Sequence, residues 1–190
     1  MDNFSIDETG FLVYRTTTED IILTNEIFNN TFGESLFLNE KTVYNKKTSR
    51  KAGILGEVVF PVFINRFYKD KTCKKSVDAS QHDFLVGKKR IDVKTKMRNV
   101  LPNMDFEASF FLYQMDFEDV DGYVFLSTIP DLSRVWFCGY MDKSGCKNNP
   151  HGRIWLAGQT DKTNGKVFHA DTFSILYKYT NQFLTLVYDE

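Results

Sequence analysis

The stretch DFLVGKKRIDVKTK, residues 83–96, decides the fold that we predict for this chain. Two runs with apolar and β-branched residues flank the pair Gly87-Lys88. A Gly-X pair between such runs predicts two antiparallel strands joined by a two-residue type II′ turn. That turn sets Val86 opposite Lys89 and fixes the register of the whole hairpin.

The same register places Asp83 opposite Asp92, which puts two carboxylates side by side. Because side chains alternate along a strand, Asp92, Lys94 and Lys96 share one face. Like charges facing each other across a strand pair, with Cβ atoms about 5 Å apart, destabilise a sheet and raise one pKa. A hard divalent cation such as Mg²⁺ would offset this repulsion, since it prefers carboxylate oxygens. Lys94 could then hold an attacking water or offset charge developing on phosphorus.

Residues 52–68, AGILGEVVFPVFINRFY, carry apolar side chains at helical spacing with Glu57 as the one acid among them. The pattern predicts a helix. Pro61 has no N–H to give to the carbonyl of Glu57, so a kink or two short helices is also compatible with it.

A helical Glu57, then Asp83, then Asp92-Val93-Lys94 on the next strand resembles the PD-(D/E)xK nuclease superfamily, over roughly residues 50–142. The resemblance implies a restriction-endonuclease-like core that hydrolyses nucleic acid, more often DNA than RNA, with Mg²⁺ as cofactor and Mn²⁺ as a substitute. It implies Glu57, Asp83, Asp92 and the Val93 carbonyl as metal ligands. It makes Lys94 the catalytic base or electrostatic stabiliser. His82 stands where the motif's name has Pro, and Pro61 lies close to Glu57.

Charge is segregated along the chain, although the formal net charge is −1. The segment from Lys41 to Arg98 holds 16 of the 24 Lys and Arg residues and 5 of the 25 Asp and Glu residues. A basic block of this kind suits a phosphate backbone, while a solvated charged face is the plain alternative. The candidate nucleic-acid contacts are Lys46, Lys47, Arg50, Lys51, Lys88, Lys89, Lys96 and Arg98.

The rest of the chain predicts one α/β domain, residues 1–190, with a central mixed sheet flanked by helices. We expect a helical segment over residues 1–50 and further strands and a helix over 143–190. Within these, the patterns predict helices at 17–32 and 105–118, a basic loop or arm at 41–51, and a strand hairpin formed by 122–129 and 134–141. They also predict strands at 153–157 and 183–188 and a helical turn at 171–178.

Composition excludes several classes of protein. Three cysteines argue against a disulfide framework, and the spacing of Cys138, Cys146 and His151 matches no compact zinc site. No leader or membrane-spanning run is recognisable, so we expect a cytoplasmic protein, in the host cytoplasm if the chain is viral; phage origin is only faintly indicated. A homodimer is compatible with the sequence. The alternative functions are a catalytically inactive nucleic-acid-binding module on the same fold, acting in assembly or inhibition, and a protein-binding adaptor.

Overall fold

The computed structural model of the chain describes residues 3–32, 40–76, 82–162 and 165–181, with side chains in the second helix described from residue 47 onward. Its centre is a seven-stranded sheet in the order β1-β2-β8-β7-β5-β4-β3. The strands are β1 (Phe4–Ile6), β2 (Leu12–Arg15), β3 (Cys73–Lys75), β4 (Phe84–Val86), β5 (Lys89–Met97), β7 (Gly122–Thr128) and β8 (Arg134–Asp142). β5 and β7 are parallel and the other neighbours antiparallel, so the sheet is mixed.

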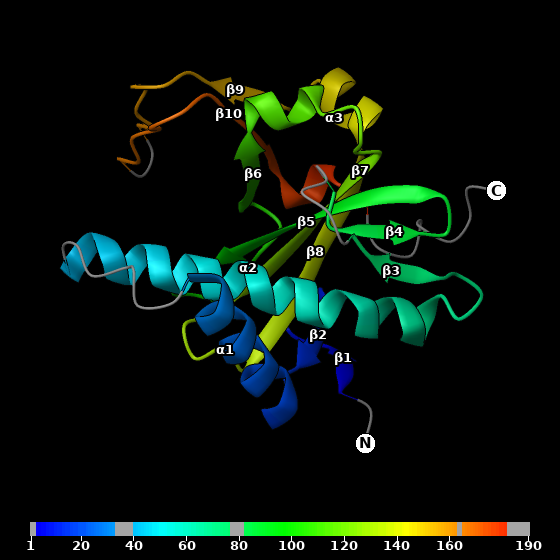
Figure 1. Cartoon of the computed structure of the whole chain (residues 1–190). Coiled ribbons are helices and arrows are strands. Elements are labelled where there is room, and N and C mark those ends of the chain that lie inside the picture. The colour runs from blue at the N-terminus through cyan, green and yellow to red at the C-terminus, as the bar shows by residue number, and fades with distance from the viewer. Residues whose placement is uncertain (1–2, 33–39, 77–81, 163–164, 182–190) are drawn as a thin grey trace.

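Helices cover one face of this sheet (Figure 1). The long helix α2 (Glu40–Phe67) lies across the strands, and α1 (Thr18–Phe32) packs against α2. α2 approaches β5 closely at Gly56, where a Cβ atom would overlap Thr95 Oγ1 and lie 3.2 Å from a methyl carbon of Leu126. The apolar face of α2, including Leu55, Val59 and Phe63, fills the first core cluster.

A second, three-stranded sheet covers the opposite face. It has the order β6-β10-β9, formed by β6 (Glu107–Phe111), β10 (Thr172–Leu176) and β9 (Arg153–Trp155). Short helical elements complete this layer: η1 (Leu112–Asp116), α3 (Lys143–Asn148) and η2 (Tyr177–Tyr179). Phe110 stacks on Tyr123 of β7 with ring centroids 4.2 Å apart, within a second core cluster. Alternation along β7 therefore sends Tyr123 and Phe125 to this core and Val124 and Leu126 to the core under α2.

The prediction of a single α/β domain with a mixed sheet is confirmed. The predicted helix at 17–32, the hairpin at 83–96 and the hairpin at 122–141 are present, and 153–155 is a strand. α2 passes through Pro61 as one helix, so the two short helices did not arise. The predicted strand at 183–188 lies outside the described residues. None of the described helices is long and apolar enough to cross a bilayer.

Four expectations were wrong. Segment 41–51 is helical, because its Lys and Arg residues are good helix formers and the side chains of Arg50 and Lys51 pack on α1. Segment 105–118 contains β6, since buried Ala108 and Phe110 alternate with Ser109 and Phe111 at the period of a strand. Segment 171–178 is mainly β10, and residues 1–50 include strands β1 and β2 as well as helix. The long helices α1 and α2 flank one face of the large sheet, while the small sheet and the short helical elements cover much of the other.

Candidate nuclease site

The β4–β5 hairpin has the predicted register, with Val86 paired to Lys89 and Phe84 to Ile91. Gly87 has φ +59°, and Lys88 does not share this positive φ, as a type II′ turn requires. Pairing with β4 ends at Ile91, whereas pairing with β7 on the other side continues to Met97. Within the described residues, β5 therefore has an open edge from Asp92 onward.

Asp83 lies immediately before β4, where β4 and β5 separate; we call this point the fork. Its main-chain N–H donates to the carbonyl oxygen of Ile91 at 3.0 Å, and its Oδ2 accepts the N–H of Val93 at 2.7 Å. A residue's N–H and C=O point to the same edge of a strand, so the Val93 carbonyl is also directed to the open edge. One carboxylate and one carbonyl oxygen thus lie together at the fork.

The other predicted residues surround Asp83. Asp92 is buried, and its Oδ2 lies 2.7 Å from Nζ of Lys94. Glu57 comes from α2, and its Oε2 lies 3.1 Å from Nζ of Lys75 on β3. Each of these two carboxylates therefore has a lysine partner.

The pKa values show that these groups act on one another. Burial, the charge of Asp92 and a hydrogen bond between the two carboxyl groups raise the pKa of Asp83 to about 7, against the lowering effects of Val93 N–H and Lys94. Burial and the charge of Asp83 raise the pKa of Glu57, while Lys75 and Lys94 oppose this. We call Glu57, Asp83, Asp92 and Lys94 the acidic cluster.

The acidic cluster is not arranged as a ready metal cage. Among the residues that the structure describes, no three Asp, Glu, His or Cys side chains are gathered as ligands of one ion. Lys75 and Lys94 hold two of the carboxylates as ion pairs, and the Val93 N–H holds the third. The donor set still fits a hard cation, because two carboxyl groups in contact inside the protein keep a proton that a cation would replace.

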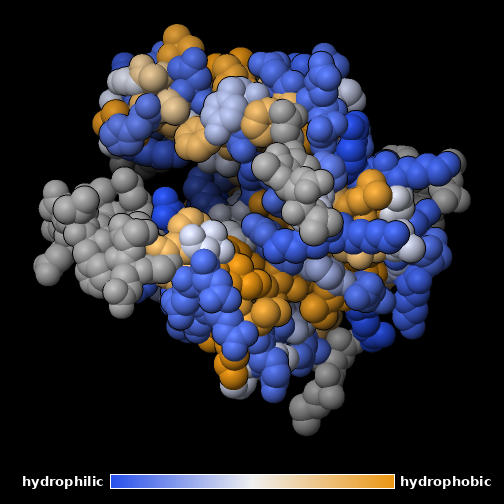
Figure 2. Space-filling view, viewed as in Figure 1, coloured by the Kyte–Doolittle hydropathy of each residue, from blue (hydrophilic) through white to orange (hydrophobic). Residues whose placement is uncertain are grey.

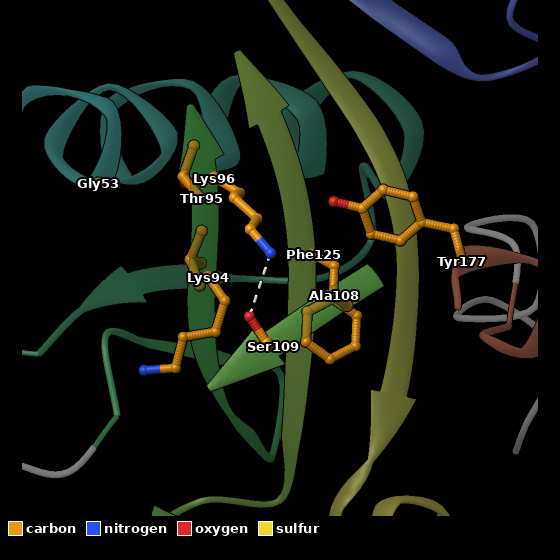
Figure 3. Close-up of a pocket in the computed structure, with 9 residues that line it drawn as sticks. Gly53, Lys94, Thr95, Lys96, Ala108, Ser109, Phe125 and Tyr177 are labelled. Atoms are coloured by element: carbon orange, nitrogen blue, oxygen red, sulfur yellow. Dashed lines mark hydrogen bonds between the residues drawn. The ribbon is translucent and has the colours of Figure 1, made fainter. Parts of the chain in front are cut away.

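A cavity of about 270 Å³ opens beside β5, between α2 and β6 (Figure 3). Lys94 and Lys96 line it, and Gly53 of α2 forms part of its wall. Nζ of Lys96 donates to the carbonyl oxygen of Glu107 and to Oγ of Ser109, both at 3.3 Å. Figure 2 shows the molecule hollowed between the α2 side and the β6–β9 side, with hydrophilic residues in the hollow.

The predicted nucleic-acid contacts whose side chains are described come from different parts of the fold. The Lys47, Arg50 and Lys51 side chains lie over the aromatic rings of α1, and the Lys46 side chain lies outside the described residues. Lys88 is exposed at the hairpin turn, and Nζ of Lys89 lies 5.9 Å from the ring centre of Tyr140.

Arg98 has a role inside the protein. It donates to the carbonyl oxygen of Glu107, to Oη of Tyr177 and to Oγ of Ser127, at 2.8 to 3.2 Å. These bonds join the large sheet to the small one. Of the seven predicted contacts with described side chains, Lys96 is the one that lines the cavity beside Lys94.

Sequence reasoning missed Lys75, which is paired with Glu57, and three residues that line cavities next to Lys94: Ser109, Lys166 and His169. None belongs to a recognisable motif, and their placement depends on long-range packing. Comparisons with protein-family models, with curated proteins and with solved structures found no match.

Proposed function

We propose that this chain is a metal-dependent nuclease of the PD-(D/E)xK type that hydrolyses phosphodiester bonds, with DNA favoured over RNA. The observation that carries the proposal is the grouping of Asp83, held by the Val93 N–H, with the Asp92–Lys94 ion pair and Glu57 at the open edge of β5. Paired carboxylates cost free energy in a sheet, so a function that uses both explains their position.

Glu57, Asp83, Asp92 and the Val93 carbonyl would hold Mg²⁺ or Mn²⁺. A bound Mg²⁺ supplies a Lewis acid and lowers the pKa of a water molecule. The Val93 N–H orients Asp83, and Lys75 orients Glu57. Nζ of Lys94, positioned by Asp92, can hold a water or stabilise negative charge that develops on the phosphoryl oxygens.

The test is cleavage of plasmid, linear duplex, single-stranded DNA, branched DNA and RNA with Mg²⁺, Mn²⁺ or EDTA. Asp92→Ala and Lys94→Ala should each reduce metal-dependent cleavage by about 10² to 10⁴-fold. Lys69→Ala is the control, because Lys69 is an exposed lysine that belongs neither to the acidic cluster nor to the predicted nucleic-acid contacts. Undiminished cleavage by both site variants, or no cleavage of any substrate by the wild type, would remove the proposal.

The ion pairs favour a second candidate, a nucleic-acid-binding module without catalysis. Lys75 and Lys94 already neutralise two of the carboxylates, and no metal cage is formed among the described residues. This candidate predicts tight binding that weakens steeply with salt and no products with either metal. Products that need metal and disappear in Lys94→Ala would exclude it.

A further inference from the structure

Two cavities meet at Lys94 and Ser109. The cavity of about 270 Å³ lies along β5, and a second one of about 450 Å³ extends under the segment from Lys166 to Ala170. The second volume lies within the ~300 to 1,000 Å³ typical of ligand pockets. Because the two cavities share Lys94 and Ser109 in their linings, one ligand can occupy both.

The lining of both cavities is cationic. It includes Lys94, Lys96 and Lys166, and neither set of described lining residues includes an Asp or Glu. The acidic cluster lies at the end of the smaller cavity, where Lys94 is shared. An anion is therefore the ligand that matches the charge of these walls.

The smaller cavity has the chemistry of a phosphate site. An ammonium group has three N–H donors, and the two bonds of Lys96 are long, at 3.3 Å. Burial, with Arg98 and Lys166 nearby, lowers the pKa of Lys96 to about 7. A phosphate placed here would restore the charged form of this lysine and accept its hydrogen bonds.

The larger cavity has the chemistry of a nucleobase site. Phe111 lines it, and its ring stacks on Tyr113 with centroids 5.7 Å apart and planes at 13°. Both rings are about half exposed, at 48% and 58%. Gln114, which also lines this cavity, is a side chain type that pairs with base edges. Exposed stacked aromatics beside lysines are typical of sites that bind single strands.

We propose that the joined cavities hold one unpaired nucleotide of the substrate, so that the chain acts on single-stranded or locally opened DNA rather than on an intact duplex. The proposal rests on the proposed nuclease function and names its substrate class. A base inside a duplex would have to leave its partner and its stack to reach Phe111, and that costs binding affinity.

The test is binding in EDTA, where cleavage by the proposed mechanism does not occur. A labelled oligothymidine and a duplex of the same length are titrated against the wild type, Phe111→Ala and Tyr179→Ala. Tyr179 is the control, because it is an exposed aromatic residue that lines neither cavity. We expect the wild type to bind the single strand at least about tenfold more tightly. Phe111→Ala should weaken that binding about 5- to 150-fold, as loss of one stacked base does, with duplex binding unchanged.

A second measurement uses the wild type alone and so does not depend on how Phe111→Ala folds. An oligonucleotide containing 2-aminopurine should lose fluorescence on binding, because stacking on an aromatic ring quenches this base. Equal affinity for duplex and single strand, no binding of either, or no effect of Phe111→Ala would overturn the proposal. Preferential single-strand binding without cleavage would remove the nuclease function and leave this site. Efficient cleavage of intact duplex, with equal binding of duplex and single strand, would remove the nucleotide site and leave the nuclease function.

Discussion

Replacing Asp83 with Asn tests the acidic cluster without a nuclease assay. Asp83 faces Glu57, Asp92 and Lys94, and its pKa in the folded protein is about 7 instead of 3.8. The folded state therefore holds this proton more tightly than the unfolded chain does. Below pH 4 both states are protonated and there is no cost to folding. The cost grows as the pH rises from 4 to 7 and is complete above 7.

The size of this effect follows from the two pKa values. About three powers of ten in proton affinity correspond to at most ~4 kcal/mol. Asp92 shares the interaction, and an amide oxygen accepts the Val93 N–H less strongly than a carboxylate does. We therefore expect Asp83→Asn to be more stable than the wild type by about 1 to 3 kcal/mol at pH 8 without metal. For a chain of this length, that raises Tm by about 2 to 12 °C.

Bound Mg²⁺ should shift the difference in stability between Asp83→Asn and the wild type in favour of the wild type. At a Mg²⁺ concentration about 100 times its Kd, the wild type should gain about 2.7 kcal/mol, whereas Asp83→Asn should gain much less. Thermal unfolding at pH 5 and pH 8, with Mg²⁺ or EDTA, measures both effects. Asp70→Asn serves as control, since its side chain is 76% exposed and should change neither. A lower Tm for Asp83→Asn at pH 8 in EDTA, or a Mg²⁺ response equal to that of the wild type, would refute the reasoning.

Three further substitutions probe the walls of the site. Gly53→Ala should stabilise the protein by about 0.5 to 1 kcal/mol in chemical unfolding, because a Cβ there meets no atom within 4 Å and Ala favours a helix; a loss of stability would contradict this. Gly56→Ala should lower the free energy of unfolding by about 1 to 3 kcal/mol, since its Cβ overlaps Thr95. Adding Thr95→Ala should recover part of this loss. If the losses of the two single variants simply add in the double variant, the overlap is not the cause. Gly53→Glu should fold normally and reduce oligonucleotide binding at least tenfold, because it adds a negative charge to the smaller cavity, and binding equal to that of Gly53→Ala would argue against a phosphate there.

The parts of the fold that sequence predicted are those set by local chemistry. The Gly87-Lys88 turn fixes the register of its own hairpin, so the proximity of Asp83 and Asp92 followed from four residues on each side. The apolar spacing around Glu57 predicted its helix in the same way.

Long-range packing decided the rest. Residues 47–51 of α2 include no apolar side chain, and rings of α1 supply the surface on which Arg50 and Lys51 pack. Lys75 reaches Glu57 only because β3 pairs with β4 at the sheet edge. Ser109 and the cavities depend on a second sheet in which β6 pairs with β10, more than 60 residues later in the chain. No local pattern encodes those distances.

Because part of the site is formed by backbone groups where β4 and β5 separate, insertions in the hairpin should disturb the site more than side-chain substitutions do. The Val93 N–H and carbonyl are backbone groups, so replacing the Val93 side chain leaves them in place. One residue inserted at the Gly87-Lys88 turn, however, would shift the pairing by one position and turn Asp83 to the opposite face from Asp92. Homologous chains that retain this site should therefore vary in side chains around the hairpin while keeping its length constant.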